Sequence, residues 1–296
     1  MLSLCSNATV GPAHILAFDT RSNSSPEFCK SVNENHLSIR QSTPTSGGMR
    51  PGDRESWLLR YGLPSVPSKD IVIMLDTSDI VIQCSYSEIV QKFKSLVRNF
   101  DNEILIGGEA LIWPRHFPKK GYPSSHNSTF INIGTIIGRA DVYMRMLSCM
   151  KTMFGTLPSM CPVGTHPDGT YIMRNSTYKY ESDQSCYHMY FVNQHTGRLP
   201  HTCPKFVIDH TAEIIVALPK VSEHLRFYKN GIHYSGKKTC LLHAAGSSKI
   251  VLPTLFAWKE KLRGGNNVTI ENILKNTRTY SKTMALKFYR SRLGFD

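Results

Sequence analysis

The sequence predicts an α/β fold, with one sheet of buried strands flanked by helices in a single domain. Three observations indicate it. Residues 71–75 are five consecutive apolar residues, the pattern of a strand buried on both faces of a parallel sheet. A helical segment and a second apolar run, residues 104–106, follow with short links, as in a strand–helix–strand crossover unit. The chain has 296 residues and 41% hydrophobic content, enough to bury a sizeable core.

The first fifty residues are the least regular part of the chain. Residues 14–18 are apolar and predict a first strand. The stretch from 22 to 48 is rich in Ser, Asn, Thr and Pro and predicts a loop. A helix is predicted from about Asp53, because apolar residues recur there at helical spacing. We therefore assign residues 1–45 to an N-terminal segment and begin the main domain at residue 46.

Strands and helices then alternate. Residues 80–82 predict a short strand, and Ser85 with Glu88 forms a capping box that starts the next helix. Residues 130–138 form an apolar strand interrupted by Asn132 and Gly134, and Asp141 is expected to cap the following helix. A glycine inside such a strand indicates close approach of a ligand or of another strand.

The C-terminal half contains a helix that starts near Asp183 and a final helix over residues 255–262. Three strands are predicted between these helices, over residues 205–209, 213–218 and 239–243. The main domain therefore spans residues 46–262, with a surface excursion over 151–180 and a basic tail over 263–296.

The formal net charge of +13 favours anionic partners. The basic residues are dispersed except in the tail, and no zinc-finger or RNA-recognition signature is present, so we do not expect specific nucleic-acid binding. The sequence contains no run of eighteen apolar residues, so no transmembrane segment is predicted. The eight cysteines lack Cys-x-x-Cys spacing, which argues against zinc. Five Asn-x-Ser/Thr sequons favour the lumen of the secretory pathway (endoplasmic reticulum or Golgi) or secretion, with the cytosol as the alternative.

Two carboxylates, Asp76 and Asp79, follow the central strand where it leaves the sheet. Ligands in open α/β sheets bind at this edge, and paired acids there suit a hard divalent cation. The alternative is that they only shape a turn or cap a helix. Asp183 begins a helix, and His243 with Lys249 follows the last strand. Oxygen ligands with one imidazole suit Mn²⁺ or Mg²⁺ better than zinc.

The order of these motifs resembles the glycosyltransferase domain of the procollagen lysyl hydroxylase/glycosyltransferase family. The resemblance runs from about residue 46 to residue 258, and the matching positions include Asp76 and Asp79, Glu109 with Trp113-Pro114, Tyr122-Pro123, residues 130–138, Asp183-Gln184, and His243 to Lys249. It implies a GT-A fold with a Rossmann-like sheet, a UDP-sugar donor and Mn²⁺. It further implies that Asp76, Asp79 and His243 bind the metal.

The remaining site residues are also carried over from this resemblance. Asp183 would lie beside the reacting sugar and Trp113 on the acceptor side. Asn132 and Gly134 would line the sugar pocket, and Ser78, Gly246 and Lys249 would contact the nucleotide. The sequence departs from the family at three of the positions that bear on activity: Ser78 replaces an aromatic residue that stacks on uracil, and Ile133 and Ala245 replace smaller or more polar residues.

The leading hypothesis is thus a metal-dependent glycosyltransferase that moves glucose or galactose from a UDP-sugar to a hydroxyl acceptor, such as hydroxylysine in a collagen-like chain. The alternative is a catalytically weak relative that binds glycans or a protein partner through its basic surface. A third hypothesis, nucleic-acid binding through residues 275–296, predicts a steep dependence of affinity on salt.

Overall fold

The computed structural model of this chain describes residues 15–18, 26–42, 53–113, 122, 130–155, 183–218, 225–228 and 231–245. The predicted final helix over 255–262 and the basic tail lie outside the described residues. The same holds for most of the predicted surface excursion, although its first residues continue a helix as far as Phe154.

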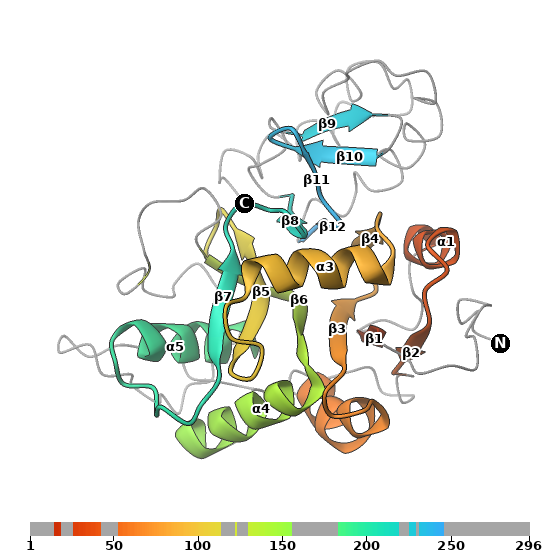
Figure 1. Ribbon diagram of the computed structural model, residues 1–296. Coiled ribbons are helices and arrows are strands. Elements are labelled where there is room, and N and C mark those ends of the chain that lie inside the picture. Colours follow the sequence, from red (N-terminus) through yellow and green to blue (C-terminus); the bar gives the residue numbers. More distant parts are fainter. Residues whose placement is uncertain are drawn as a thin grey trace, which may run out of the picture.

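The main sheet has six strands in the order β2-β1-β3-β6-β5-β7 (Figure 1). Strand β6 runs antiparallel to both of its neighbours, β3 and β5, whereas the other neighbouring pairs are parallel. The α/β fold is confirmed, but the sheet is mixed rather than parallel. The strands are β1 (Ile15–Phe18), β2 (Ile39–Gln41), β3 (Ile71–Asp76), β5 (Glu103–Glu109), β6 (Phe130–Arg139) and β7 (Lys205–Asp209).

Strand β3 is buried on both faces, as its unbroken apolar run predicts. Val72 and Met74 belong to one hydrophobic cluster, and Ile73 and Leu75 belong to another on the opposite face. Side chains alternate along a strand, so a strand covered on both sides must be apolar at every position. Full burial of each such side chain contributes roughly 1.5–3 kcal/mol relative to exposure.

Helices cover the two faces of the sheet (Figure 1). Helices α1 (Pro26–Glu34) and α3 (Tyr86–Leu96) contribute Phe28 and Phe93 to the cluster on one face. Helices α4 (Ala140–Phe154) and α5 (Asp183–His195) pack against the other face through residues such as Tyr143 and Tyr187. Helix α2 (Asp53–Trp57) continues into a π-helical turn over Leu58–Gly62 and a 3₁₀ turn over Leu63–Ser65, on the same face as α4.

The predicted helix starts near Asp53, Ser85 and Asp183 hold, and the one at Asp141 shifts. Ser85 is the N-cap of α3, and its hydroxyl accepts a hydrogen bond from the backbone N–H of Glu88. Asp141 is not the cap of α4, since Arg139, which still has extended backbone as the last residue of β6, occupies that position. Asp141 lies inside the first turn and pairs with Arg139 and Lys69.

The loop predicted for residues 22–48 is wrong over α1 and β2. Two polar residues of this stretch, Ser31 and Asn35, bind the backbone of a neighbouring strand, β4 (Ile80–Ile82). Ser31 Oγ accepts from Ile82 N–H at 3.2 Å, and Asn35 Nδ2 donates to the Ile82 carbonyl at 3.1 Å. Polar residues usually indicate a loop, but here their side chains satisfy the backbone N–H and C=O groups of a strand. This is a tertiary contact, which the local composition does not reveal.

Two small sheets complete the described part of the chain. In the first, β12 (Leu241–His243) lies between β4 and β8 (Ile215–Ala217). The other, which the sequence analysis did not anticipate, contains β9 (Leu225–Tyr228), β10 (Gly231–Tyr234) and β11 (Lys237–Lys238). No helix among the described residues has the length and apolar character needed to cross a membrane.

All six cysteines in the described part are disulfide-bonded. Cys84 pairs with Cys240 and Cys149 with Cys203. Cys29 and Cys186 are bonded as well.

Candidate functional site

The sheet topology brings polar residues from several strands to one edge. Strands β3, β5 and β7 run in one direction, so their last residues Asp76, Glu109 and Asp209 end on the same side of the sheet. Strand β6 runs the opposite way and begins there, which places Asn132 opposite Gly107 of β5. The edge predicted from Asp76 therefore also receives Glu109 and Asn132.

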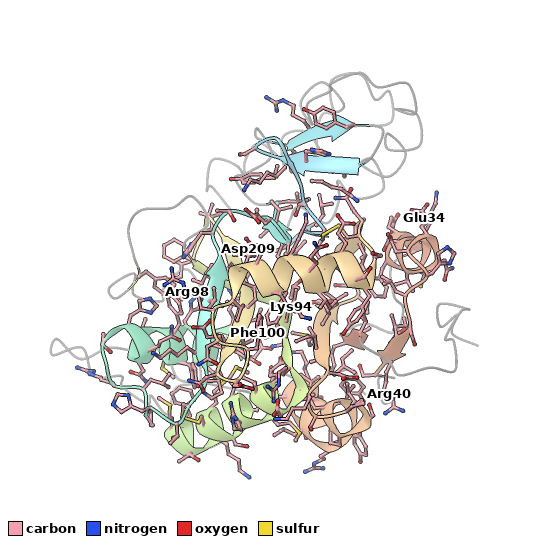
Figure 2. All side chains as sticks on the ribbon, in the orientation of Figure 1. Glu34, Arg40, Lys94, Arg98, Phe100 and Asp209 are labelled. Atoms are coloured by element: carbon pink, nitrogen blue, oxygen red, sulfur yellow. A yellow bond between two sulfur atoms is a disulfide. The ribbon has the colours of Figure 1, made fainter. Side chains whose placement is uncertain are left out.

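Asp209, labelled in Figure 2, has a structural part at this edge. Its carboxylate accepts hydrogen bonds from the backbone N–H groups of Glu213, Ile214 and Ile215, at 2.8–3.1 Å. These bonds fix the turn from β7 to β8 and thereby the small sheet that β8 forms with β12.

Strand β12 carries His243 to Asp79. It pairs antiparallel with β4 so that His243 lies opposite Ile80, the residue after Asp79. The backbone N–H of Ala244 donates to the Asp79 carbonyl at 2.8 Å. As a result His243 Nε2 lies 3.4 Å from Asp79 Oδ1, and both side chains are buried.

Asn132 orients the imidazole of His243. Asn132 Oδ1 accepts the backbone N–H of Gly134 at 3.0 Å and lies 2.7 Å from His243 Nδ1. Because Oδ1 is an acceptor, Nδ1 must bear the proton in this pair, which turns Nε2 toward Asp79.

Gly134 makes room for that ring. A Cβ atom at this position would lie 2.2 Å from His243 Cε1 and 2.7 Å from both ring nitrogens. The close approach expected at this glycine is therefore that of the His243 imidazole. Glycine is required because every other residue would occupy the space of the ring.

The acids around His243 favour its charged form. Burial by itself lowers the pKa of His243, but the charges of Asp79, Asp76 and Glu109 act in the opposite direction, and the net pKa is raised above 6.5. The carboxylates therefore favour positive charge at this position, and a metal ion bound at Nε2 would take the place of the proton there.

Asp76 stands slightly apart from this pair. Its Oδ1 accepts from the Ser78 N–H at 3.1 Å and from the Ser78 hydroxyl at 2.9 Å, so Ser78 orients Asp76 within the turn. The ligand atoms of Asp76, Asp79 and His243 do not all lie within 4.8 Å of one another. Within the described ranges one group meets that limit, Cys84 with Glu88 and Cys240, and its two sulfur atoms are bonded to each other.

Glu109 is a site residue to which the sequence analysis gave no role of its own. Its carboxylate oxygens accept from Gln184 Nε2 at 2.9 Å and Asn132 Nδ2 at 3.1 Å. Burial, only partly offset by these bonds, raises its pKa to about 7. Its position at the end of a buried strand, like that of Asp76, was the signal that could have identified it.

Polar contacts continue from Glu109 to the segment of Trp113. Gln184 Nε2 lies 3.5 Å from His188 Nε2, which in turn donates to the Trp113 carbonyl at 2.8 Å. Burial lowers the pKa of His188 to about 4, so its ring is neutral, and Nδ1 accepts from the Tyr122 hydroxyl. Trp113 as a whole residue is 52% exposed, so it lies beside the site with much of its surface open to solvent.

Asp183 lies on the other side of β6. Arg54 Nη2 is 3.1 Å from Asp183 Oδ2 and 2.6 Å from Glu55 Oε1, while Arg54 Nη1 donates to the carbonyl of Ile133. Tyr187 donates its hydroxyl proton to Glu55 at 3.0 Å. Arg54 is buried and thus ties Asp183 to the sheet, a contact that the sequence did not predict.

Residues 41–153 match a family model described as "PLOD GT domain". The match covers less than half of the chain, and over these residues it confirms the resemblance drawn from the motif order. The matched segment contains Asp76, Asp79, Glu109 and Asn132, whereas Asp183 and His243 lie beyond it.

Other similarities are weaker. The chain is 20% identical over 251 residues to the uncharacterized protein R699 of Acanthamoeba polyphaga mimivirus. The alignment covers 81% of this chain and 47% of that protein, so the chain spans about half the length of this relative. A glycosyltransferase involved in glycosylation of the major capsid of PBCV-1 is 13% identical, with a TM-score of 0.44, 80% coverage of this chain and 96% of that one. The galactosyltransferase LgtC is 13% identical, with a TM-score of 0.43 and coverages of 92% and 99%.

Two predicted site residues, Gly246 and Lys249, lie outside the described residues. A pocket of about 460 Å³ opens at the opposite edge of the sheet, beside Ile71, and is lined by Lys94 and Phe100 (Figure 2). This pocket lies at the start of β3, whereas the acidic residues of the candidate site lie at the end of that strand. Two of the pocket's three basic residues, Lys69 and Arg139, are paired with Asp141.

The raised pKa of Glu109 predicts a dependence of stability on pH. A carboxyl whose pKa is about 7 when folded and 4.5 when unfolded binds more protons in the folded state between these values. The stability of the protein should therefore fall as pH rises from about 4.5 to 7, by about 3 kcal/mol from this group. Glu109→Gln should remove that contribution, which urea unfolding at several pH values would measure.

Glu34→Gln serves as the control, because Glu34 is an exposed glutamate of α1 (Figure 2). The unfolding free energy of the Glu34→Gln variant should change with pH as that of the wild-type protein does. Identical profiles for Glu109→Gln and wild type would show that Glu109 is not protonated preferentially in the folded state.

Proposed function

We propose that the chain is a divalent-cation-dependent glycosyltransferase that moves a hexose from a UDP-sugar to a hydroxyl acceptor. The observation that supports this most directly is the approach of His243 to Asp79 at the edge of the sheet where Asp76 also ends. It occurs in a chain whose preceding part matches a glycosyltransferase family.

The residues present fit a cation of the Mn²⁺ or Mg²⁺ type. Two ligand atoms that bind one ion at about 2.1 Å and at right angles lie about 3 Å apart, close to the 3.4 Å between His243 Nε2 and Asp79 Oδ1. Asp79 and His243 would hold the ion, and Asp76, oriented by Ser78, would complete the protein ligands. The bound ion would stabilise the negative charge of the UDP leaving group.

The other residues would bind and orient the two substrates. Asp183, held by Arg54, would orient the acceptor hydroxyl or stabilise positive charge on the sugar. The exposed residue Trp113 would contact the acceptor. Asn132 keeps Nε2 of His243 directed at Asp79, and Ser78, Gly246 and Lys249 would lie on the nucleotide side.

The disulfides support a location of this activity in an oxidising compartment. Every described cysteine is bonded, and disulfides persist in oxidising compartments such as the endoplasmic reticulum, the Golgi and the extracellular space. A secretory-pathway location would place the enzyme with secreted acceptors, among which collagen-like chains with hydroxylysine are our first choice.

A second candidate function is favoured by two observations. The three proposed ligands are not assembled within 4.8 Å of one another, and Ser78 offers no ring for the uracil base. A relative that binds glycans or a protein partner without turnover would show these features.

The experiment that tests the enzyme is release of UDP from UDP-glucose and UDP-galactose, with Mn²⁺ or with a chelator. Added hydroxylysine or galactosyl-hydroxylysine peptides should increase the release if they are acceptors. We expect turnover that stops on chelation, and an increase in the thermal midpoint when UDP and Mn²⁺ are added together. Absence of both effects for both donors would contradict the enzyme hypothesis and leave the hypothesis of a binding protein without turnover.

A further inference from the structure

The Cys84–Cys240 disulfide joins the two strands that carry the Asp79–His243 pair. Cys84 lies just after β4, and Cys240 immediately precedes β12. Both cysteines are buried. Asp79 is at the other end of β4, and His243 is at the other end of β12. The disulfide and the candidate cation ligands therefore occupy the two ends of one short ladder.

The ladder between β4 and β12 is short. It consists of three residue pairs, Ile80 to Ile82 against Leu241 to His243. Successive side chains of a strand point to opposite faces, so a slip of one residue would turn His243 away from Asp79. A slip of two residues would move the ring by about 7 Å along the strand.

A bond between Cys84 and Cys240 excludes both slips. Their Cα atoms lie 4.9 Å apart, and a slip of two residues would exceed the limit of about 7 Å that a disulfide tolerates between these atoms. A slip of one residue would turn the two Cβ atoms to opposite faces, where the sulfur atoms cannot meet. The bond also connects segments separated by 156 residues in the chain. The backbone supports the same register, since Gln83 N–H donates to the Cys240 carbonyl at 2.7 Å.

We propose that Cys84 and Cys240 are positioning residues, whose disulfide fixes β4 against β12 and so holds His243 at Asp79. The affinity of the site for a divalent cation then depends on this bond. The inference rests on the proposed function, because it takes Asp79 and His243 as cation ligands.

The second disulfide provides a matched control. Cys149 lies in α4 and Cys203 precedes β7, and both pack with the hydrophobic cluster on the α4 side of the sheet. This bond spans 54 residues, and the entropy of loop closure depends only logarithmically on that length. Removing either disulfide should therefore destabilise the protein to a similar extent, but only one removal should disturb the cation site.

The experiment compares Cys84→Ala/Cys240→Ala with Cys149→Ala/Cys203→Ala and the wild-type protein. Mn²⁺ alone is titrated, with the unbound ion measured by electron paramagnetic resonance, at a temperature where circular dichroism shows each protein folded. We expect the dissociation constant for Mn²⁺ to rise at least tenfold in the first variant and less than twofold in the second. Hydrogen exchange of the Leu241–His243 amides should accelerate in the first variant only.

Equal Mn²⁺ affinity of the first variant and the wild type would overturn the inference and leave the proposed function intact. A wild-type protein that does not bind Mn²⁺ would instead contradict the proposed function, and the inference with it. If the double alanine variant does not fold, Cys84→Ala/Cys240→Val refills part of the lost volume and is judged by the same ratio.

Discussion

Asp79→Asn is expected to lower the rate of sugar transfer by a factor of about 10² to 10³. The substitution keeps the shape of the side chain but removes a buried carboxylate 3.4 Å from His243 Nε2. It would take away one anionic ligand of the proposed cation and, with it, stabilisation of the leaving diphosphate, an effect of this order for a charge-stabilising group. The measurement is the initial rate of UDP release at saturating Mn²⁺.

The thermal midpoint separates a functional role of Asp79 from a structural one. Without ligands, Asp79→Asn should melt near the wild-type temperature, and UDP with Mn²⁺ should no longer raise the midpoint. Asp101→Asn is the control, because Asp101 is an exposed residue whose carboxylate pairs with Arg139 at the other edge of the sheet. Loss of activity together with a large drop in the unliganded midpoint would show that Asp79 is structural.

Gly134→Ala is expected to abolish activity through His243. The new Cβ atom would lie 2.2 Å from His243 Cε1, so the ring has to leave its position. Its contacts with Asn132 and Asp79 would both be lost. We expect transfer to fall at least about a hundredfold, comparable with loss of the charge-stabilising group itself, and stability to fall by about 1–3 kcal/mol, the usual effect of overpacking.

Two further variants test whether displacement of the His243 ring causes the expected losses in Gly134→Ala. Gly138→Ala lies on the same strand, but its Cβ would meet Ile104 Cγ1 at 3.1 Å, so activity per folded molecule should persist. In the double variant Gly134→Ala/His243→Ala the overlap is absent. It should therefore be as stable as His243→Ala alone while remaining inactive, which a double-mutant cycle on unfolding free energies measures. Equal losses from Gly134→Ala with and without His243 would contradict this account.

Comparison of sequence and structure separates local from long-range determinants. The apolar run of β3 predicted a strand buried on both faces, and Ser85 predicted the start of α3, because side-chain alternation and backbone capping depend on neighbours in the chain. The same reasoning failed around α1, where Ser31 and Asn35 bind both the local backbone and that of Ile82 in β4. Composition alone could not distinguish these two uses of polar residues.

The sequence by itself determined the buried strands, most of the helix starts and the acids at the end of β3, because each follows from the spacing of residues close together in the chain. Only the tertiary structure decided that β6 inserts antiparallel between β3 and β5, and that β12 pairs with β4. Those pairings bring Asn132 and Gly134 to His243 and bring His243 to Asp79, across more than a hundred residues of chain. Strand pairing over such separations is set by the packing of the whole core, which no local pattern encodes.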